Sequence, residues 1–287
     1  MAEHIESSTN DMDEIIFPMI EYGNEEAEFH IRNNRANPFQ RAHVIQRIGH
    51  GVAIQCNLID VVHGGLSADS DYWATILVFQ FRFDPEKNAR RIARATIDLG
   101  FDSTETDARI PEVDSISFDG NYSFSPSKET VTVTKGGEGG VGASFVANIN
   151  TTLKWERTVG HEKSHAATIS GRKLLDDEVG LAPTAQWTLL ENDSQKTGVP
   201  TSIQLAVRVK RMDEAVFSCN VNLTCKADRR TAMQNFFGGL PEDDPILLQP
   251  TKPSKNRLMK YDFEELGAVD LDQLGAVTPT TMLPEAQ

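Results

Sequence analysis

"TSIQLAVRVKRMDEAVFSCNVNLTCK", residues 201–226, contains two consecutive runs in which apolar and polar side chains alternate. Every second residue of each run is apolar, and most of the residues between them are polar or charged. Successive side chains of a β-strand point to opposite faces, so a period of two indicates a strand with one buried face. The two runs are therefore predicted to be antiparallel strands, and residues 211–215 are predicted to join them as a hairpin.

Further stretches of the chain show the same alternation, and turn residues separate them. Residues 86–96 carry a competing helical pattern, but 90–101, "RRIARATIDLGF", also fits a strand whose buried face holds Ala93, Ala95, Ile97 and Leu99. Many strands with few helices are typical of sandwiches and barrels. We predict an all-β fold, an antiparallel β-sandwich or barrel-like fold with disordered acidic arms at both ends. The other predicted strands cover 52–62, 73–83, 115–124, 165–175 and 185–192.

Charge is distributed unevenly along the chain. The first 28 of the 287 residues hold nine carboxylates and residues 261–287 hold six, and neither end holds a Lys or Arg. These fifteen charges exceed the net charge of -14, so residues 29–260 carry +1. We therefore predict a partly disordered acidic N-terminal arm at 1–40, a single β-sandwich domain at 41–250, and a linker with an acidic disordered tail at 251–287.

The N-terminus and the cysteines indicate the cellular compartment. "MAEHIESSTNDMDE" lacks the basic and apolar regions of a signal peptide, and no apolar run reaches the length of about 18 residues that predicts a transmembrane helix. Cys219 and Cys225 are expected to lie roughly 20 Å apart on one strand, beyond disulfide reach. We predict that these two and Cys56 are buried thiols and that the protein is cytoplasmic.

Several phrases of the sequence resemble phrases in the proteins of a known group. They are "ILVFQFRFD", "RRIARATI", "TLKWERT", "HAATISGRKL", "AQWTLLENDSQKTGVPTSIQLAVRVKR" and "PEDDPILLQP". Over about residues 70–250 the chain resembles a broad group of uncharacterised β-rich proteins of filamentous fungi. The resemblance implies a fungal source and an all-β fold. No activity is known for the group, so no functional residues carry over.

The motif "HEKSH", residues 161–165, matches the H-E-x-x-H pattern of zinc hydrolases. On a helix, His161 and His165 would bind zinc and Glu162 would act as general base, with Glu178 or Glu191 as a third ligand. The flanking residues favour strands, however, and two His at this spacing on a strand lie roughly 13 Å apart. We therefore interpret the motif as a polar turn and predict neither a metal nor a cofactor.

A second polar cluster contains the residue types of a hydrolase triad. The residues near its serine, "GGLSAD", lack the G-x-S-x-G elbow that exposes a nucleophile, and "KGGEGGVG" lacks the features of a phosphate-binding loop. An enzymatic alternative without a sequence signature stays open, namely a β-cavity that guides a cyclisation in fungal secondary metabolism. The members of this cluster are His43, His50, Asp60, His63 and Ser67.

Residues 131–156 are a candidate membrane segment. Within 145–155, apolar residues alternate mostly with Ser, Asn, Thr and Lys, and a glycine-rich tract precedes them at 136–142. A transmembrane β-strand needs about 9–11 residues with one apolar face. An ordinary sandwich strand shows the same alternation, so both interpretations stay open. The candidate membrane-hairpin residues are Phe145, Ile149, Leu153 and Trp155.

The C-terminal tail carries the sequence Leu-Gly-Ala-Val twice, at 266–269 and 274–277. Acidic residues alternating with small apolar groups predict a disordered peptide that a partner binds. The alternative is an inert tail that only increases solubility. The residues that would contact a partner are Leu266, Val269, Leu274 and Val277.

The segment 29–51 is rich in Arg and His, but a near-neutral body with acidic arms repels phosphate, so we expect no nucleic-acid partner. We expect this segment to pair with the acidic arm beside it. The leading hypothesis is a non-enzymatic intracellular β-sandwich that binds a protein or small-molecule partner. The alternatives are a membrane-active, pore-forming-like protein that inserts a hairpin around 131–156, and an enzyme of either kind described above. The sequence leaves the oligomeric state open.

Overall fold

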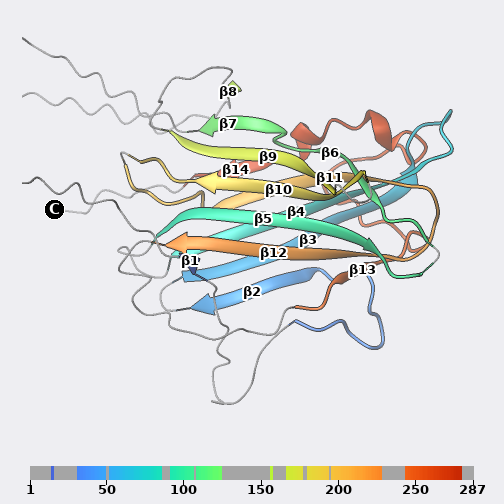
Figure 1. Ribbon diagram of the computed structural model, residues 1–287, viewed down its shortest axis with the longest axis horizontal. Helices are drawn as coiled ribbons and strands as arrows, with labels where there is room; N and C mark the ends of the chain where they lie inside the picture. The colour runs from blue at the N-terminus through green and yellow to red at the C-terminus, as the bar shows by residue number, and fades with distance from the viewer. Residues whose placement is uncertain are drawn as a thin grey trace, which may run out of the picture.

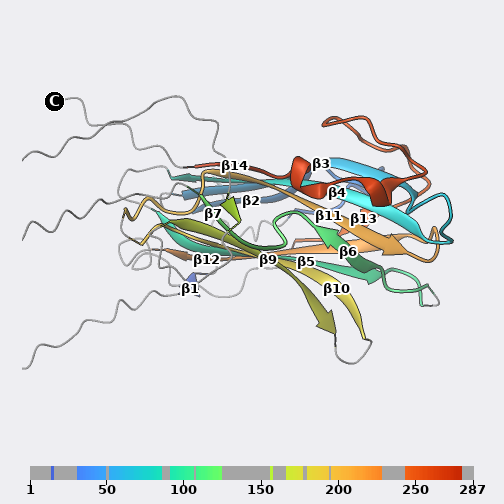
Figure 2. The same ribbon diagram turned by 90° about the horizontal axis from the view of Figure 1, so that it is seen from above.

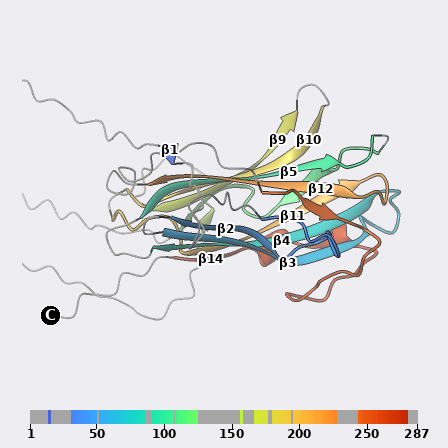
Figure 3. The same ribbon diagram turned by 90° about the horizontal axis from the view of Figure 1, so that it is seen from below.

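The computed structural model describes residues 14–15, 31–49, 52–85, 91–106, 108–124, 156–157, 166–176, 180–193, 195–227 and 243–279. They form two antiparallel sheets that lie face to face (Figures 1 and 2). Figure 3 shows the same two layers from the opposite side. The prediction of an all-β sandwich is confirmed, and within the described residues the sheets stay separate layers rather than closing into one barrel.

The larger sheet has eight strands in the order β1-β12-β5-β10-β9-β7-β8, with β13 paired to β12. Their bounds are β1 (Glu14–Ile15), β5 (Ile92–Ser103), β7 (Gly120–Phe124), β8 (Glu156–Arg157), β9 (Ala167–Asp176), β10 (Leu181–Leu190), β12 (Phe217–Ala227) and β13 (Ile246–Leu248). The smaller sheet has six strands in the order β14-β11-β4-β3-β2, with β6 paired to β11. Their bounds are β2 (His43–Gly49), β3 (Val52–Gly65), β4 (Trp73–Pro85), β6 (Glu112–Ile116), β11 (Ser202–Arg211) and β14 (Ala276–Thr278).

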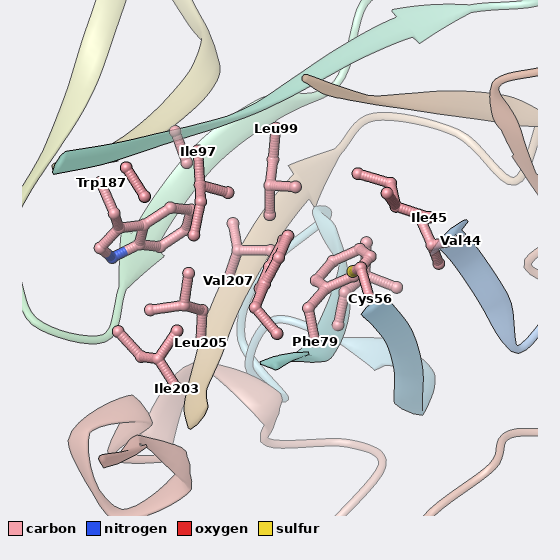
Figure 4. Packing of buried hydrophobic residues seen from close by; sticks show 14 of the residues in the cluster. Val44, Ile45, Cys56, Phe79, Ile97, Leu99, Trp187, Ile203, Leu205 and Val207 are labelled. Carbon is pink, nitrogen blue, oxygen red and sulfur yellow. The ribbon is translucent and has the colours of Figure 1, made fainter. Parts of the chain in front are cut away.

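The core lies between the two sheets, where inward side chains of both interdigitate (Figure 4). Residues 92–103 form a strand, as the alternation allowed, and Ala95, Ile97 and Leu99 are fully buried on its inner face. Each large apolar side chain buried in this way stabilises the fold by about 1.5–3 kcal/mol. The three cysteines are buried free thiols, as predicted.

The predicted hairpin of residues 201–226 is wrong. β11 belongs to the smaller sheet and β12 to the larger one, so residues 211–215 cross between the layers. Alternation fixes which face of a strand is buried, but it does not identify the neighbouring strand. Arg211 holds the crossing in place, because Nη1 donates to the Asp213 carbonyl at 2.6 Å and the guanidinium lies 5.6 Å from the Phe217 ring centre.

The predicted strand 115–124 is two strands in different sheets. β6 pairs with β11 and β7 pairs with β9, so the chain changes layer at residues 117–119. Phe118 and Gly120 adopt positive φ angles of 58° and 101° in this crossing. The Asp119-Gly120 pair, a common turn sequence, was the sequence signal for the break.

The prediction of a disordered tail is wrong for residues 251–279. They form two short 3-10 helices, η1 (Leu266–Ala268) and η2 (Leu271–Leu274), followed by β14, which pairs with β11. We call residues 252–279 the C-terminal strap. It crosses the outer face of the smaller sheet, where Asp60 accepts hydrogen bonds from the Arg257 and Leu258 amides and from the Tyr261 hydroxyl.

Apolar packing holds the strap on the sheet. Leu266, Leu271 and Leu274 are at most 3% exposed and pack with side chains on the outer face of β3, β4 and β11. The chain approaches closely, since a Cβ on Gly64 would lie 2.1 Å from the Phe263 carbonyl oxygen. Leu266 and Leu274 are therefore not available to a partner as the tail hypothesis required, whereas Val269 and Val277 are only partly buried. The sheet-facing residues of the cluster are Val62, Ala74, Ile76, Val78 and Ala206.

Residues 31–47 contact residues 243–245, which lie more than 190 positions later in the chain. The Ile31 and Asn33 amides donate to the carboxylates of Asp243 and Asp244 at 2.8 Å. Arg47 forms an ion pair with Asp243 at 2.6 Å. Arg47 thus pairs with a residue that precedes β13. The acidic N-terminal arm, the partner expected for this segment, lies outside the described residues except at 14–15.

Candidate functional site

The edge of the larger sheet at β7 and β8 is the candidate functional site. These strands pair antiparallel, with Tyr122 opposite Arg157 and Ser123 opposite Glu156 (Figure 1). Between Phe124 and Glu156 lie the 31 residues 125–155, which include most of the predicted membrane segment. The chain therefore leaves this edge and returns to it on neighbouring antiparallel strands, which is the geometry at the base of a β-hairpin.

Close packing fixes β7 on the rest of the sheet. Gly171 of β9 allows the approach, because a Cβ there would lie 2.3 Å from the Phe118 carbonyl oxygen. Trp187 is fully buried beneath this contact, and its Nε1 donates to the Ser117 carbonyl at 2.8 Å. Phe124, the last described residue before the 31-residue segment, is itself 7% exposed. The base of the segment is thus anchored in the core.

The C-terminal strap also contacts this base. Asp272 of η2 accepts a hydrogen bond from the Phe118 amide at 2.9 Å and another from the Tyr122 hydroxyl at 3.3 Å. The Tyr122 and Phe118 rings meet edge to face with centres 5.4 Å apart. Residues 150 positions apart therefore converge where β7 begins, and the acidic tail contributes one carboxylate to the arrangement.

The hairpin and zinc-motif candidates lie outside the described residues. This applies to Phe145, Ile149, Leu153 and Trp155 and to His161, Glu162 and His165, as well as to Glu178. Within the described ranges, no three His, Cys, Asp or Glu side chains come together as a metal site.

Glu191, the remaining candidate for a metal ligand, has structural partners. It accepts hydrogen bonds from Arg91 at 3.0 Å and from the Gly198 amide at 3.1 Å, and its side chain is 4% exposed. Its carboxylate therefore joins the β4–β5 connection to the β10–β11 connection.

The cluster that held the residue types of a triad is split by β3. Asp60 faces outward beneath the strap. Val62 also packs outward, so His63, the next residue of the strand, points to the inner face. His63 is buried and hydrogen-bonds through its ring nitrogens to Gln40 and Thr75, both at 2.9 Å. Burial, together with the nearby Arg211 charge, lowers the pKa of His63 to about 3, so the ring is neutral. Asp60 and His63 are structural residues.

Two hollows bear on the cyclisation alternative. One, lined by Val52, Phe83, Ile92 and their neighbours, holds about 20 Å³, which is room for a single water. The other holds about 210 Å³ but is an open hollow on the outer face of the larger sheet, lined by polar side chains. Neither resembles the enclosed apolar pocket of several hundred cubic ångströms that a cyclisation substrate requires.

No known protein-family model matches the sequence, and no curated protein matches it either. Among solved structures, one match is the crystal structure of the Clostridium perfringens NetB toxin in the membrane-inserted form. It covers 75% of this chain and 91% of that chain, with 9% sequence identity and a TM-score of 0.28. This similarity in sequence and structure is too low to assign an activity. Among the described residues, no helix is long and apolar enough to cross a bilayer.

Proposed function

We propose that the chain is a non-enzymatic β-sandwich protein that acts on membranes by extending residues 125–155 as a β-hairpin. The observation that carries the proposal is the antiparallel register of β7 and β8 at the two ends of that segment. A hairpin that continues this register needs no rearrangement of the sandwich, because its base is already paired and anchored through Phe124 and Gly171.

The length and pattern of the segment support the proposal. Residues 145–155 supply eleven residues with mostly apolar side chains on one face. Residues 125–135 supply eleven more before the glycine-rich tract, but there the apolar Val131 and Val133 share their face with Glu129 and Lys135. A strand of 9–11 residues crosses the hydrocarbon core of a bilayer when tilted. Ser, Thr and Asn on the second face suit a water-filled lumen.

A single hairpin is not sufficient for a stable membrane structure. Its two outer strand edges would leave backbone amides and carbonyls unpaired in hydrocarbon, at a cost of several kcal/mol for each group. Several copies must therefore contribute hairpins to one closed barrel. The membrane-bound form is expected to be an oligomer.

Release of dye from vesicles tests the proposal. Full-length protein should release dye from anionic vesicles, and Ile149→Asp should abolish release, since it places a charge on the apolar face of the hairpin. Asn148→Asp is the matched control on the opposite face, where a carboxylate is tolerated in a lumen. Equal release by the two variants, or none by the parent protein, would refute the hairpin.

A second candidate function is binding of a protein partner through the end of the sandwich where the strap meets the β3–β4 connection. Gly65 of β3 donates to the Phe263 carbonyl at 2.7 Å and lies opposite Trp73 of β4, so the two segments are neighbours. Large apolar side chains on these two segments are 37–45% exposed, and an apolar patch that they form together would mark a binding surface. They are Tyr72, Trp73, Leu258, Met259 and Phe263.

Chemical cross-linking in a cell extract tests this candidate. Phe263→Ser should remove any specific cross-linked partner, because the side chain is 45% exposed and contributes to the apolar surface. Leu175→Ser, at a residue 72% exposed on the β9–β10 hairpin, is the control. A cross-linking pattern that the two variants share with the parent protein would exclude partner binding at this end.

A further inference from the structure

The outer face of the larger sheet carries two cations side by side. Arg94 of β5 and Lys226 of β12 are cross-strand neighbours, and directly beside them Thr96 faces Thr224. Like charges placed opposite each other in a sheet destabilise the pair unless an anion neutralises them. Among the side chains that the structure describes, neither cation has an ion-pair partner. On its other side, the backbone of Lys226 pairs with that of Glu14 in β1.

These four side chains surround a surface hollow. They line the open hollow of about 210 Å³ on the outer face. Arg94 is exposed, whereas the two threonines and Lys226 are half-buried. A guanidinium, an ammonium and two hydroxyl donors are the groups that bind a phosphate.

The hollow lies level with the base of the proposed hairpin. One row of cross-strand neighbours connects the two places. It begins with Lys226 and Arg94, crosses β10 and β9 at Leu190 and Thr168, and ends at Ser123 and Glu156. Arg94 and Ser123 are three strands apart, roughly 14 Å. Figure 1 shows the ends of β12 and β7 and the start of β5 at the same end of the sandwich.

We propose that Arg94 and Lys226, with Thr96 and Thr224, bind the phosphate of a lipid headgroup. The choice of a lipid phosphate rests on the proposed membrane function and on Leu190, which follows Arg94 in the row and is 42% exposed, as suits contact with the lipid beneath a headgroup. The net charge of -14 opposes an anionic surface, but salt screens distant charges within about 8 Å, and the local pair then dominates. Bound phosphate would hold the β7–β8 edge at the level of the headgroups.

Co-flotation with vesicles tests the site on the full-length chain. Vesicles of phosphatidylcholine with phosphatidic acid are compared with vesicles of phosphatidylcholine alone. The double variant Arg94→Gln/Lys226→Gln should bind the phosphatidic acid vesicles about thirtyfold more weakly than the parent protein, since each basic side chain contributes about fivefold. Arg82→Gln/Arg172→Gln removes the same charge at two other exposed positions and should change binding by less than about twofold.

Three results would overturn the site. The first is failure of the parent protein to prefer phosphatidic acid, and the second is equal weakening by both double variants, which would reflect net charge alone. The third is a shift of the Thr96 and Thr224 amide resonances by inorganic phosphate without any effect of Arg94→Gln/Lys226→Gln on vesicle binding, which would assign the hollow to free phosphate. The hairpin is tested separately by dye release: Ile149→Asp should still bind phosphatidic acid vesicles while releasing no dye. A parent protein that binds in this way but releases no dye would refute the hairpin and leave the phosphate site supported.

Discussion

Replacing Leu266 with alanine is expected to destabilise the whole sandwich. Leu266 belongs to the acidic tail, yet its side chain is 0% exposed and lies against the outer face of β3 and β4. Its carbonyl oxygen accepts from Arg208 at 3.2 Å, and its Cδ1 lies 3.1 Å from the position that a Cβ of Gly64 would occupy. The surroundings are therefore close-packed and partly backbone, so they cannot collapse readily into the space that the substitution leaves.

The magnitude follows from this packing. Leucine-to-alanine changes at fully buried sites cost about 2–5 kcal/mol, with the larger values where the cavity stays open. We expect a loss of about 3 kcal/mol in the free energy of unfolding of Leu266→Ala. In urea, with a slope of about 2–3 kcal/mol per molar, the midpoint should fall by more than about 1 M.

Equilibrium unfolding followed by tryptophan fluorescence in a Trp73→Phe/Trp155→Phe background is the assay, because Trp187 is then the only tryptophan and, buried between the sheets, reports the core rather than the strap. Leu175→Ala is the control, at a residue 72% exposed, and should shift the free energy by less than about 0.5 kcal/mol. If Leu266→Ala unfolded at the same midpoint as the parent protein, the strap would not be part of the cooperative unit.

Three further predictions concern the core. Gly171→Ala should cost about 3 kcal/mol or more and expose the β7 edge to proteolysis, because the new Cβ would lie 2.3 Å from the Phe118 carbonyl oxygen; limited proteolysis compared with Gly100→Ala, whose Cβ would contact only Thr184 Oγ1 at 3.7 Å, checks this. His63 has a folded-state pKa of about 3, below the usual 6.5, so the unfolded chain binds the extra proton between these values. Its contribution to stability is therefore present above about pH 6.5 and is lost as the pH falls toward 3; urea midpoints of the parent protein should fall more steeply over this window than those of His63→Gln. Cys56, Cys219 and Cys225 are fully buried with raised pKa values, so a thiol reagent should label none of them before global unfolding, and fast labelling in native buffer would contradict the packing.

Alternation along the sequence was sufficient to predict the inner face of β5, β11 and β12. In β5 it separated the buried Ala95 and Leu99 from the exposed Arg94. It failed for strand partners, because the pairing of β11 with β4 and of β12 with β5 depends on contacts more than 100 residues apart. The crossings at 117–119 and 211–215 are consequences of those distant pairings, and local pattern does not contain them.

The strap was missed although the sequence carried a signal for it. Residues 76–79 of β4, "ILVF", are apolar on both parities, and a strand that is apolar on both faces must be covered on both. Ile76 and Val78 point to the outer face and are fully buried there by the strap. The two Leu-Gly-Ala-Val repeats are the complementary signal, since their leucines cover this face.

The candidate site, too, was predicted in part from local pattern and missed where it depends on distant pairing. The pattern of 145–155 supplied the hypothesis of a membrane strand, but the pairing of Ser123 with Glu156 is a relation across the 31-residue segment that no local period encodes. The pairing of Arg94 with Lys226 spans more than 130 positions and was invisible for the same reason. The net charge predicted that the chain repels phosphate. Net charge sums over the whole molecule, so it does not show that two cations lie side by side on one face.

The strap and the hairpin base are physically connected, which decides how membrane action must be measured. Asp272 joins the strap to the Phe118 amide and to Tyr122 of β7, and Gly275 lies against the Phe118 ring. Trimming the chain at residue 250 would therefore remove a contact of β7 and also expose Ile76 and Val78 to water. Leakage that grew after such trimming would report a damaged sandwich as readily as a released hairpin. Asp272→Asn separates the two, since it keeps the three buried leucines in place and weakens only the hydrogen bonds to β7: faster dye release at an unchanged urea midpoint would assign the strap a restraining role.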